Sequence, residues 1–420
     1  MDTIVINGGA KLSGTVTTGG AKNSALPLLF ATLLADGEYR FHNVPLLRDI
    51  DSTVALLEHL DCEAQRDGNT LTVRTGECTH RDAPYDIVRK MRASILCLGP
   101  LLSRYGRARV SLPGGCAIGT RPINLHIESL QQMGAEIEIE NGFVIARARR
   151  LHGTCIVFEN ATVGGTENLM LAATLARGTT VLENAAKEPE IVDLADCLVK
   201  MGARIEGAGS SVIQIEGVDE LRPCNHTVIP DRIEAGTLLI AGAITGGDVR
   251  INNCIPGHID ALVQRMTECG FRIDAGSDWL RILPCDGWRA VDASTAPYPG
   301  FPTDLQAQFM ALMTVAKGTS VITERIFENR FMHVQELVRM GANITQKTQV
   351  SVVRGKPGGL TGAPVMATDL RASASLVLAG LAARGETTVN RIYHLDRGYE
   401  KLEAKLKSLG AQIDRRAGEN

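Results

Sequence analysis

The sequence predicts an α/β protein assembled from six diverged copies of one unit of about 70 residues. Three recurring observations predict this fold class. A turn glycine leads into a strand-like run, a helix ends at a glycine and leads into another strand, and an apolar helix precedes each turn glycine. Taken in order, these signals define a unit of helix, turn, strand, helix, glycine and strand.

The first signal is the turn glycine, which tolerates a positive φ at the start of a run with strand-like composition. It recurs six times, at Gly37–Phe41, Gly106–Val110, Gly178–Leu182, Gly247–Ile251, Gly318–Ile322 and Gly385–Val389. The apolar helices expected before these turns are Ala25–Leu34, Ala93–Leu102, Leu169–Leu175, Ala235–Ile244, Gln306–Val315 and Ala372–Ala382.

The second signal is a glycine placed as the left-handed stop of a more amphipathic helix. The stops are Met133-Gly134-Ala135, Met201-Gly202-Ala203, Cys269-Gly270-Phe271, Met340-Gly341-Ala342 and Leu409-Gly410-Ala411, with Leu60-Asp61-Cys62 as a degenerate first copy. The helices Ile191–Met201, Val334–Met340 and Tyr399–Leu409 end at such stops. Because the period exceeds that of common solenoids, we expect a pseudo-symmetric globular arrangement with three units per domain.

Composition excludes several classes of protein. The 420 residues suffice for two or three domains, and 44% are hydrophobic. Aromatic residues are only 4% and the net charge is −3, so neither base stacking nor a global field favours nucleic acid. The start lacks signal-peptide features, and the apolar run Ala25–Ala35 is too short to span a bilayer, so we expect a soluble cytoplasmic protein without membrane partners.

The ten cysteines are scattered without a C-x-x-C pair, which predicts buried small hydrophobes and neither disulfides nor a metal site. Cys116 differs because it lies in the glycine-rich segment from Leu112 to Arg121, which is expected to form a loop. Four roles remain open for its thiol. They are a nucleophile served by a base such as His126, a redox thiol, a general acid, and a structural cysteine.

Several cations and one acid stand at expected helix starts. The segment Gly19 to Ser24 combines glycines, Lys22 and a helix N-terminus, which suits a phosphate or carboxylate, although an ordinary turn with a solvated lysine is equally compatible. It is not a P-loop. Arg92 and Arg371 occupy equivalent helix starts and suit an anion, while an Asp369–Arg371 ion pair is the structural alternative for Arg371.

Asp304 is either a helix N-terminal acid or a general base aimed at a sugar hydroxyl. Arg397 also stands near an expected helix start, so its role is either structural or functional. Arg330, in a polar segment before a helix, suits either an anion or a bridge between domains.

Seven motifs together indicate a family. They are Gly20-Ala21-Lys22-Asn23, Lys90-Met91-Arg92-Ala93-Ser94, Leu112-Pro113-Gly114-Gly115-Cys116, Phe301-Pro302-Thr303-Asp304, Phe327-Glu328-Asn329-Arg330-Phe331, Ala367-Thr368-Asp369-Leu370-Arg371-Ala372 and Asp396-Arg397-Gly398-Tyr399. From about residue 1 to 417 the chain resembles the UDP-N-acetylglucosamine 1-carboxyvinyltransferase family, also called enolpyruvyl-UDP-GlcNAc synthases. This distribution makes the resemblance far more specific than any single motif.

The resemblance implies two inside-out α/β barrel domains, with helices inside, sheets outside and three units each. It implies a discontinuous first domain of residues 1–21 with 230–420, and a second domain of residues 22–229 that carries the Cys116 loop. In this family the active site lies in the cleft between the domains, which explains why candidate residues come from both halves of the chain.

The implied reaction transfers an enolpyruvyl group from phosphoenolpyruvate to the 3-hydroxyl of UDP-N-acetylglucosamine and releases phosphate. It proceeds by addition and elimination through a tetrahedral ketal, and it is the first committed step of peptidoglycan synthesis. No metal or organic cofactor is expected, because the cations balance the charge of the phosphate. A monomer or weak homo-oligomer is expected.

The resemblance also assigns roles by matched position. Lys22, Arg121 and Arg397 would hold phosphate, and Arg92 and Arg371 would orient phosphoenolpyruvate. Asn23 would contact the intermediate, Asp304 would act on the 3-hydroxyl, and Cys116 would protonate C3 and assist product release. The implied catalytic set is thus Cys116, Asp304, Lys22 and Arg397. The implied nucleotide-sugar surface is Arg121, Pro122, Ile123, Asn124, Leu125, Asn160, Ala161, Thr162, Val163 and Ile326.

One departure and three alternatives accompany this interpretation. Asn160–Val163 lacks the lysine found in some members, which leaves the uridine contacts less defined. Some members have aspartate where this chain has Cys116, so the retained thiol predicts alkylation by the epoxide fosfomycin. The alternatives are 5-enolpyruvylshikimate-3-phosphate synthase, whose pattern lacks the cysteine loop, a catalytically inert nucleotide-sugar-binding homologue, and a protein-interaction scaffold.

Overall fold

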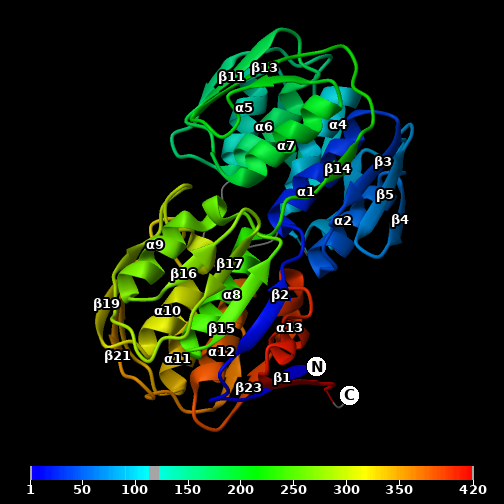
Figure 1. The fold of residues 1–420 in the computed structure, drawn as a ribbon. Helices are drawn as coiled ribbons and strands as arrows, with labels where there is room; N and C mark the ends of the chain where they lie inside the picture. Colours follow the sequence, from blue (N-terminus) through cyan, green and yellow to red (C-terminus); the bar gives the residue numbers. More distant parts are fainter. Residues whose placement is uncertain (1, 90, 113–122, 419–420) are drawn as a thin grey trace. The chain divides into compact units, whose positions relative to one another are not determined.

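The computed structural model describes residues 2–89, 91–112 and 123–418, which fall into two compact units. The C-terminal unit contains the described residues of 2–19 and 230–418, and the central unit contains those of 20–112 and 123–229 (Figure 1). Each unit has its own hydrophobic core. The chain therefore passes between the units after Gly19 and again after Ile229.

The described strands form six four-stranded sheets, and all six follow one plan. An edge strand runs parallel to the strand that follows the turn glycine, and two further antiparallel strands complete the sheet. In the first sheet, Phe41 is paired with His226 of the edge strand on one side and with Leu71 of the hairpin on the other. This confirms the predicted α/β fold of six repeats, three in each unit.

The central unit holds three of these sheets and the helices between their strands. In order across each sheet, the strands are β14 (Asn225–Thr227), β3 (Gly37–His42), β5 (Thr70–Thr75) and β4 (Glu63–Asp67); β6 (Asp82–Ala83), β7 (Arg107–Ser111), β9 (Phe143–Arg147) and β8 (Glu136–Glu140); and β10 (Cys155–Val157), β11 (Thr179–Glu183), β13 (Val212–Glu216) and β12 (Arg204–Glu206). The helices are α1 (Lys22–Ala31) with η1 (Thr32–Leu34), α2 (Arg48–His59), α3 (Tyr85–Val88), η2 (Arg92–Cys97) with α4 (Leu98–Tyr105), α5 (Asn124–Gln132), α6 (Val163–Ala173) and α7 (Pro189–Lys200).

The C-terminal unit repeats the plan. Its sheets are β2 (Ser13–Thr17), β15 (Asp248–Asn252), β17 (Trp279–Ile282) and β16 (Ile273–Ala275); β18 (Ala293–Ser294), β19 (Gly318–Thr323), β21 (Val350–Gly355) and β20 (Asn343–Lys347); and β22 (Pro364–Met366), β23 (Glu386–Asn390), β1 (Thr3–Asn7) and β24 (Gln412–Arg416). Its helices are α8 (Arg232–Ile244), η3 (Pro256–Ile259) with α9 (Asp260–Cys269), η4 (Thr303–Leu305) with α10 (Gln306–Thr314), α11 (Val334–Arg339), α12 (Leu370–Ala382), η5 (Ile392–Arg397) and α13 (Leu402–Ser408).

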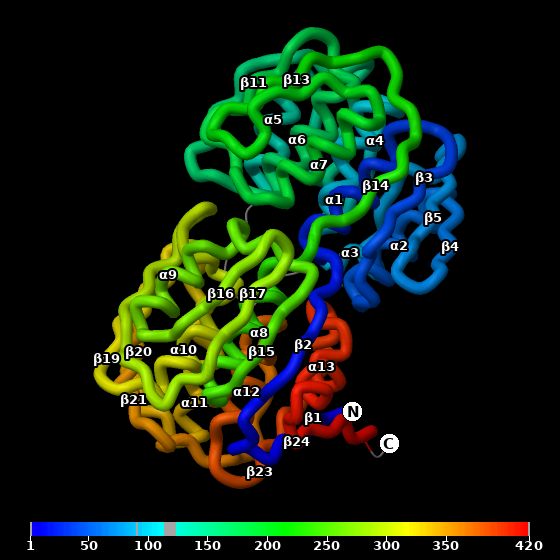
Figure 2. The backbone as a smooth tube through the Cα atoms, in the orientation of Figure 1, coloured from blue at the N-terminus to red at the C-terminus, as the bar shows by residue number. Residues whose placement is uncertain are grey.

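Three sheets are completed by strands that are remote in sequence. The strand β14, at the end of the central unit, closes the first sheet beside β3. In the C-terminal unit β2 pairs with β15, and β1 lies between β23 and β24, as the trace in Figure 2 also shows. Each chain crossing therefore comes shortly after a paired edge strand, β2 before the first crossing and β14 before the second.

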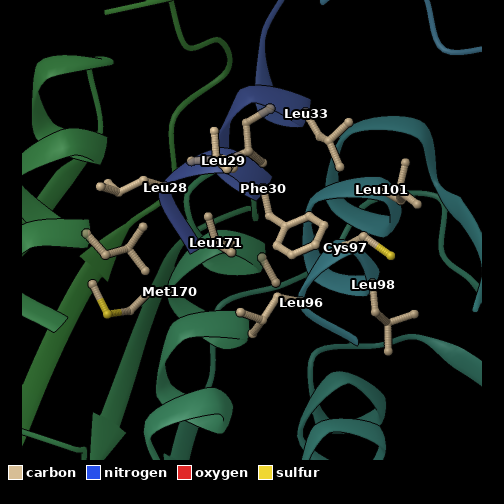
Figure 3. Close-up of a cluster of buried hydrophobic side chains, with 14 of the residues drawn as sticks. Leu28, Leu29, Phe30, Leu33, Leu96, Cys97, Leu98, Leu101, Met170 and Leu171 are labelled. Atoms are coloured by element: carbon tan, nitrogen blue, oxygen red, sulfur yellow. The ribbon is translucent and has the colours of Figure 1, made fainter. Parts of the chain in front are cut away.

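The apolar helices lie inside and the sheets lie outside. In α8 and α12 almost every residue is buried, so these helices have no solvent-facing stripe. Figure 3 shows the corresponding core of the central unit, where Phe30 of α1 lies among Leu96, Leu101 and Leu171 of the neighbouring helices. The inside-out arrangement implied by the resemblance is confirmed.

Several helix boundaries differ from the sequence prediction, and two of the differences have a local cause. The helix expected to start at Leu169 begins at Val163, because Thr162 caps it by accepting a hydrogen bond from the Gly165 amide at 3.3 Å. Burial of this turn overrides the low helix propensity of Gly164 and Gly165. The helix expected over Tyr399–Leu409 forms only over Leu402–Ser408, after Lys401 adopts a left-handed φ of 46°.

The predicted glycine stops are confirmed by their backbone conformation. Positive φ angles of 92°, 107°, 109°, 95° and 98° are found at Gly134, Gly202, Gly270, Gly341 and Gly410. The degenerate copy keeps the same conformation, since Asp61 has a φ of 64°. Its carboxylate accepts hydrogen bonds from the amides of Thr79 and His80, which the glycines of the other copies cannot make.

Two glycines of the central unit test whether a left-handed backbone conformation requires glycine at the helix stops. Replacing Gly202 by alanine meets no atom within 4 Å but forces a side chain to a φ of 107°. We expect a loss of about 1–2 kcal/mol, read as a lower Tm in thermal unfolding. The matched variant Gly76→Ala is equally uncrowded and has no positive φ, so its Tm should be unchanged or higher. Equal Tm changes for both variants would contradict this account.

A second repeat, which the sequence analysis missed, follows the turn strands. Asn43, Asn184 and Asn253 come directly after β3, β11 and β15 and have φ angles of 58°, 55° and 54°. Each side-chain amide donates to the carbonyl of the residue directly after the parallel edge strand, namely Val228, Phe158 and Thr18, at 2.9, 2.9 and 2.8 Å. This contact fastens the edge strand to its neighbour.

The nine described cysteines are all free thiols. Most are buried, as expected, but the expectation fails for Cys155, which is exposed. Within the described part of the chain, none of the helices combines the length and apolar character needed to cross a membrane.

Candidate active site

Three aspartates mark the starts of the central helices of the C-terminal unit. Asp231 caps α8 and Asp369 caps α12, each through backbone amides of the first turn. Asp304 lies in η4, just before α10, and makes no such cap. Its carboxylate instead binds two arginines, so it is not simply an acid favoured by a helix dipole.

The Asp304 carboxylate lies between Arg330 and Arg371. Its Oδ1 accepts from Arg330 Nη2 at 2.7 Å, and its Oδ2 accepts from Arg371 Nη2 and Nε at 2.8 and 3.2 Å. The Arg371 side chain is 3% exposed and the Asp304 side chain 24%. The alternative of an Asp369–Arg371 ion pair is wrong, because Asp369 binds the Arg371 backbone amide while the guanidinium turns to Asp304.

These charges fix the protonation of the pair. Burial raises the pKa of Asp304, but the Arg371 and Arg330 charges outweigh it and hold that pKa well below its usual range. Burial alone would lower the pKa of Arg371, but the Asp304 charge raises it overall. Asp304 is therefore ionised and able to accept a hydrogen bond from a hydroxyl, yet it is a weak base while both arginines hold it.

Arg371 retains one unused donor. Among the described residues, its buried Nη1 has no hydrogen-bond partner, although its other nitrogens bind Asp304 and its guanidinium lies 5.3 Å from the Tyr399 ring centroid. A buried donor without a partner is costly unless a ligand or water satisfies it. Nη1 is thus a donor left over for a water or a ligand.

The depressed pKa of Asp304 predicts a pH dependence of stability. Unfolded aspartate titrates near pH 3.9, so the stabilisation from ionised Asp304 should be complete above about pH 5. It should be lost as the pH falls from there through the lower folded pKa. Chemical denaturation of wild type and Asp304→Asn should therefore show a difference of about 2 kcal/mol at neutral pH that shrinks below pH 4. A difference that grows on acidification would contradict the assigned charge state.

The remaining candidates of this unit lie nearby in the fold. Arg397 is the last residue of η5, which packs against α12. The charges of Arg397 and Asp369 both affect the pKa of His394. Burial first, and then the Arg397 charge, lowers the pKa of His394. The amide of Ile326 donates to Glu324 Oε1 at 2.8 Å, and Glu324 also binds Thr303 beside Asp304. The unit therefore brings the Ile326 segment to the helix start that carries Asp304.

In the central unit, Lys22 is the first residue of α1 and is 8% exposed. Its Nζ lies 2.6 Å from Oδ2 of the buried Asp49 in the first turn of α2, so the alternative of a solvated lysine is wrong. Asn23 follows it in the same turn. The turn is anchored further because the Ser24 hydroxyl donates to Asp193, whose other oxygen lies 2.7 Å from His226 Nε2.

Arg92 begins η2, which packs against both α1 and α6. Its charge reaches His126 in α5, where burial first and then Arg92 lowers the histidine pKa to about 4. Asn168 Nδ2 lies 3.0 Å from His126 Nδ1, while Asn168 Oδ1 accepts from the Gly99 amide. This neutral ring is a poor proton acceptor at physiological pH.

Two segments of the expected nucleotide-sugar surface come together here. Asn124 and Leu125 form the first turn of α5 after Ile123, and Val163 begins α6 after its cap Thr162. A Cβ placed on Gly164 would lie 4.0 Å from His126 Cε1, so these two first turns are in contact. Asn160 and Ala161 directly precede Thr162, the cap of α6. Cys116, Arg121 and Pro122 lie outside the described residues.

Sequence reasoning missed three polar residues that hold the candidates in place, namely Asp49, Thr303 and Glu324. Asp49 is an acid on the buried face of an amphipathic helix, which was an available signal. Thr303 and Glu324 had no local signal, because their importance arises only from contacts across the fold.

Comparison with known proteins agrees with this fold. The family model described as EPSP synthase (3-phosphoshikimate 1-carboxyvinyltransferase) matches residues 6–406. The chain is similar in structure to the enolpyruvyl transferase NikO from Streptomyces tendae, with a TM-score of 0.88, 28% identity and coverage of 99% of this chain and 98% of that one. An EPSP synthase from Acinetobacter baumannii has a TM-score of 0.79 at 16% identity, covering 99% of this chain and 100% of its own, and shares the fold.

The fold and the family model together define an enolpyruvyl transferase. A protein named UDP-N-acetylglucosamine 1-carboxyvinyltransferase from Bdellovibrio bacteriovorus is 63% identical over 412 residues, covering 98% of this chain and 100% of that protein. The chain belongs to the UDP-N-acetylglucosamine 1-carboxyvinyltransferase family.

Proposed function

We propose that this protein transfers the enolpyruvyl group of phosphoenolpyruvate to the 3-hydroxyl of UDP-N-acetylglucosamine and releases phosphate, which commits the sugar to peptidoglycan. The observation that carries the choice of acceptor is the 63% identity, over nearly the full length, to a protein named for that reaction. Identity to the solved EPSP synthase is only 16%, so shikimate 3-phosphate is the weaker candidate acceptor.

The proposed chemistry is an addition followed by an elimination. The sugar O3 forms a bond to C2 of phosphoenolpyruvate while an acid delivers a proton to C3, which gives a tetrahedral ketal. The bond from C2 to the bridging phosphate oxygen then breaks, phosphate leaves, and a proton is lost from C3 to restore the double bond. Stabilising the phosphate charge by fixed cations is the main demand on the protein.

The residues of both units fit named roles in this scheme. Lys22, Arg121 and Arg397 bind the phosphate, and Arg92 and Arg371 orient phosphoenolpyruvate and the ketal. The unpartnered Nη1 of Arg371 supports an anion-binding role. Asn23 contacts the intermediate, and Cys116 is the acid that protonates C3. Arg121 to Leu125, Asn160 to Val163, and Ile326 contact the nucleotide sugar.

In this proposal the Asp304 carboxylate accepts a hydrogen bond from the 3-hydroxyl of the sugar. Its carboxylate is ionised and a quarter exposed, which supports accepting a hydrogen bond from the sugar. Asp304 would remove the proton only after Arg330 and Arg371 bind its carboxylate less strongly. This change would occur once the charge of the substrate competes for the two arginines. The acceptor hydroxyl is then oriented first and deprotonated as its bond to C2 forms.

Isotope labelling tests the scheme. Phosphoenolpyruvate carrying ¹⁸O in the bridging position should yield labelled phosphate when UDP-N-acetylglucosamine is present, because the C2–O bond breaks. Unlabelled phosphate would indicate cleavage at phosphorus and would contradict the addition and elimination route. The protein should need no added metal or organic cofactor, and we propose that it acts in the cytoplasm as a monomer or weak homo-oligomer, without nucleic-acid or membrane partners.

The Cys116 thiol predicts sensitivity to fosfomycin. With the nucleotide sugar present, the epoxide should alkylate this thiol, and peptide mass spectrometry should locate one adduct on the Cys116 peptide. The exposed thiol Cys155 is the internal control and should remain unmodified, since exposure alone does not provide a binding site for the epoxide. Absence of the adduct from the Cys116 peptide would refute the prediction.

A further inference from the structure

Glu324 holds a position that is an asparagine in three of the other five copies and is Leu112 or Arg391 in the remaining two. In three other copies the residue after the turn strand is an asparagine with a left-handed φ, which donates to a carbonyl of the neighbouring edge strand. In the fifth copy this position, directly after β19, holds Glu324, and its φ is not positive. In the fifth copy a carboxylate therefore stands where three copies have a side-chain amide.

The Glu324 side chain is completely buried and accepts four hydrogen bonds. Its Oε1 accepts from the Thr295 hydroxyl at 2.8 Å and from the amides of Ile326 and Phe327 at 2.8 and 3.2 Å. Its Oε2 accepts from the Thr303 hydroxyl at 2.8 Å. Within the described part of the chain all four partners are neutral, and a buried carboxylate without a cation is a costly arrangement.

The Thr303 contact sets the direction of a hydrogen-bond chain. A carboxylate can only accept, so the Thr303 proton points to Glu324 and its lone pairs face Arg330, whose Nη1 lies 2.9 Å away. Arg330 Nη2 then donates to Asp304 Oδ1 at 2.7 Å. The chain therefore runs from Glu324 through Thr303 and Arg330 to Asp304.

We propose that Glu324 and Thr303 are positioning residues of the transferase, which fix Arg330 against Asp304 and, through the amides after Glu324, fix the Ile326 segment. The proposal rests on the proposed function, because it concerns the geometry at the carboxylate that receives the acceptor hydroxyl. Neither residue touches the reacting atoms in this account. Their influence reaches the reaction through Arg330 and Asp304.

The test compares threonine and glutamate variants in a phosphate-release assay. Thr303→Val removes the hydroxyl while keeping the side-chain shape, and kcat should fall about 10- to 100-fold. Thr303→Ser keeps the hydroxyl and should retain activity within about threefold of wild type. Glu324→Gln can offer an amide N–H to Thr303 and so reverse this contact, and kcat should fall about 10-fold.

Thr314→Val is the matched control. Thr314 is buried at the other end of α10, where its hydroxyl binds the Ala311 carbonyl and, among the described residues, no other group. This variant should keep the wild-type kcat and KM, although its Tm can fall. Rescue by serine, and not merely a Tm change, distinguishes positioning from simple stabilisation.

The outcomes separate two kinds of failure. If wild type releases no phosphate with UDP-N-acetylglucosamine, the proposed function fails. If wild type is active and folded Thr303→Val is equally active, or Thr303→Ser is as impaired as Thr303→Val, the positioning proposal is overturned. If Thr303→Val does not fold, wild-type kcat in the isosteric Glu324→Gln variant overturns it instead.

Discussion

Replacing Arg371 by methionine is expected to lower the free energy of unfolding by about 3 kcal/mol and to reduce kcat/KM by about 100- to 1,000-fold. The stability loss arises because Asp304 would keep its charge with only one of its two partners, in a largely buried setting. The estimate is at the lower end for a broken buried pair because Arg330 remains. The activity loss arises from removing the buried Nη1 that is available to an anion.

Two variants control this experiment. Arg354→Met removes an exposed arginine of β21 and should change neither stability nor activity appreciably, because within the described part of the chain its side chain binds only the Thr345 hydroxyl. The double variant Arg371→Met with Asp304→Asn should be less destabilised than the two single losses added together, because it leaves no unpaired carboxylate. Additive losses in urea denaturation would show that the two side chains are energetically independent, contrary to the geometry.

The second large effect is expected at Cys116. Cys116→Ser should lose about 10²- to 10⁴-fold in phosphate release, because a serine hydroxyl is a far weaker proton donor than a thiol. Cys116→Asp should retain activity, since a carboxylic acid can deliver the same proton, and it should resist fosfomycin. Steady-state phosphate release by the three proteins, with Cys155→Ser as an exposed-thiol control, measures this directly. Equal rates for wild type and Cys116→Ser would rule out an essential acid.

The repeat architecture was predictable because its signals are local. Glycines such as Gly202 and Gly410 are required by a left-handed backbone, and all-apolar helices such as α12 must be buried, so both are visible in the sequence. The start of α6 was not predictable from propensity, because Thr162 and tertiary packing determine it. The completion of sheets by β1, β2 and β14 depends on chain crossings that local patterns do not encode.

In the candidate site, too, the sequence identifies individual residues but not the contacts between them. Arg371 and Asp304 were identifiable as charged residues at helix starts, but their mutual ion pair joins residues 67 positions apart and has no local signature. Lys22 was identifiable as a cation, whereas its pairing with Asp49 required the packing of α1 against α2. Glu324 had no local signature, because its role depends on hydrogen bonds to Thr295 and Thr303 from other parts of the chain.

The central claim is that the acceptor is UDP-N-acetylglucosamine and the donor phosphoenolpyruvate. The most direct measurement is mass spectrometry and NMR of the product formed when the protein receives phosphoenolpyruvate with an equimolar mixture of UDP-N-acetylglucosamine and shikimate 3-phosphate. The account predicts one product, the nucleotide sugar carrying an enolpyruvyl ether at its 3-oxygen, formed together with one equivalent of phosphate. Modification of shikimate 3-phosphate alone, or no product from either acceptor, would contradict it.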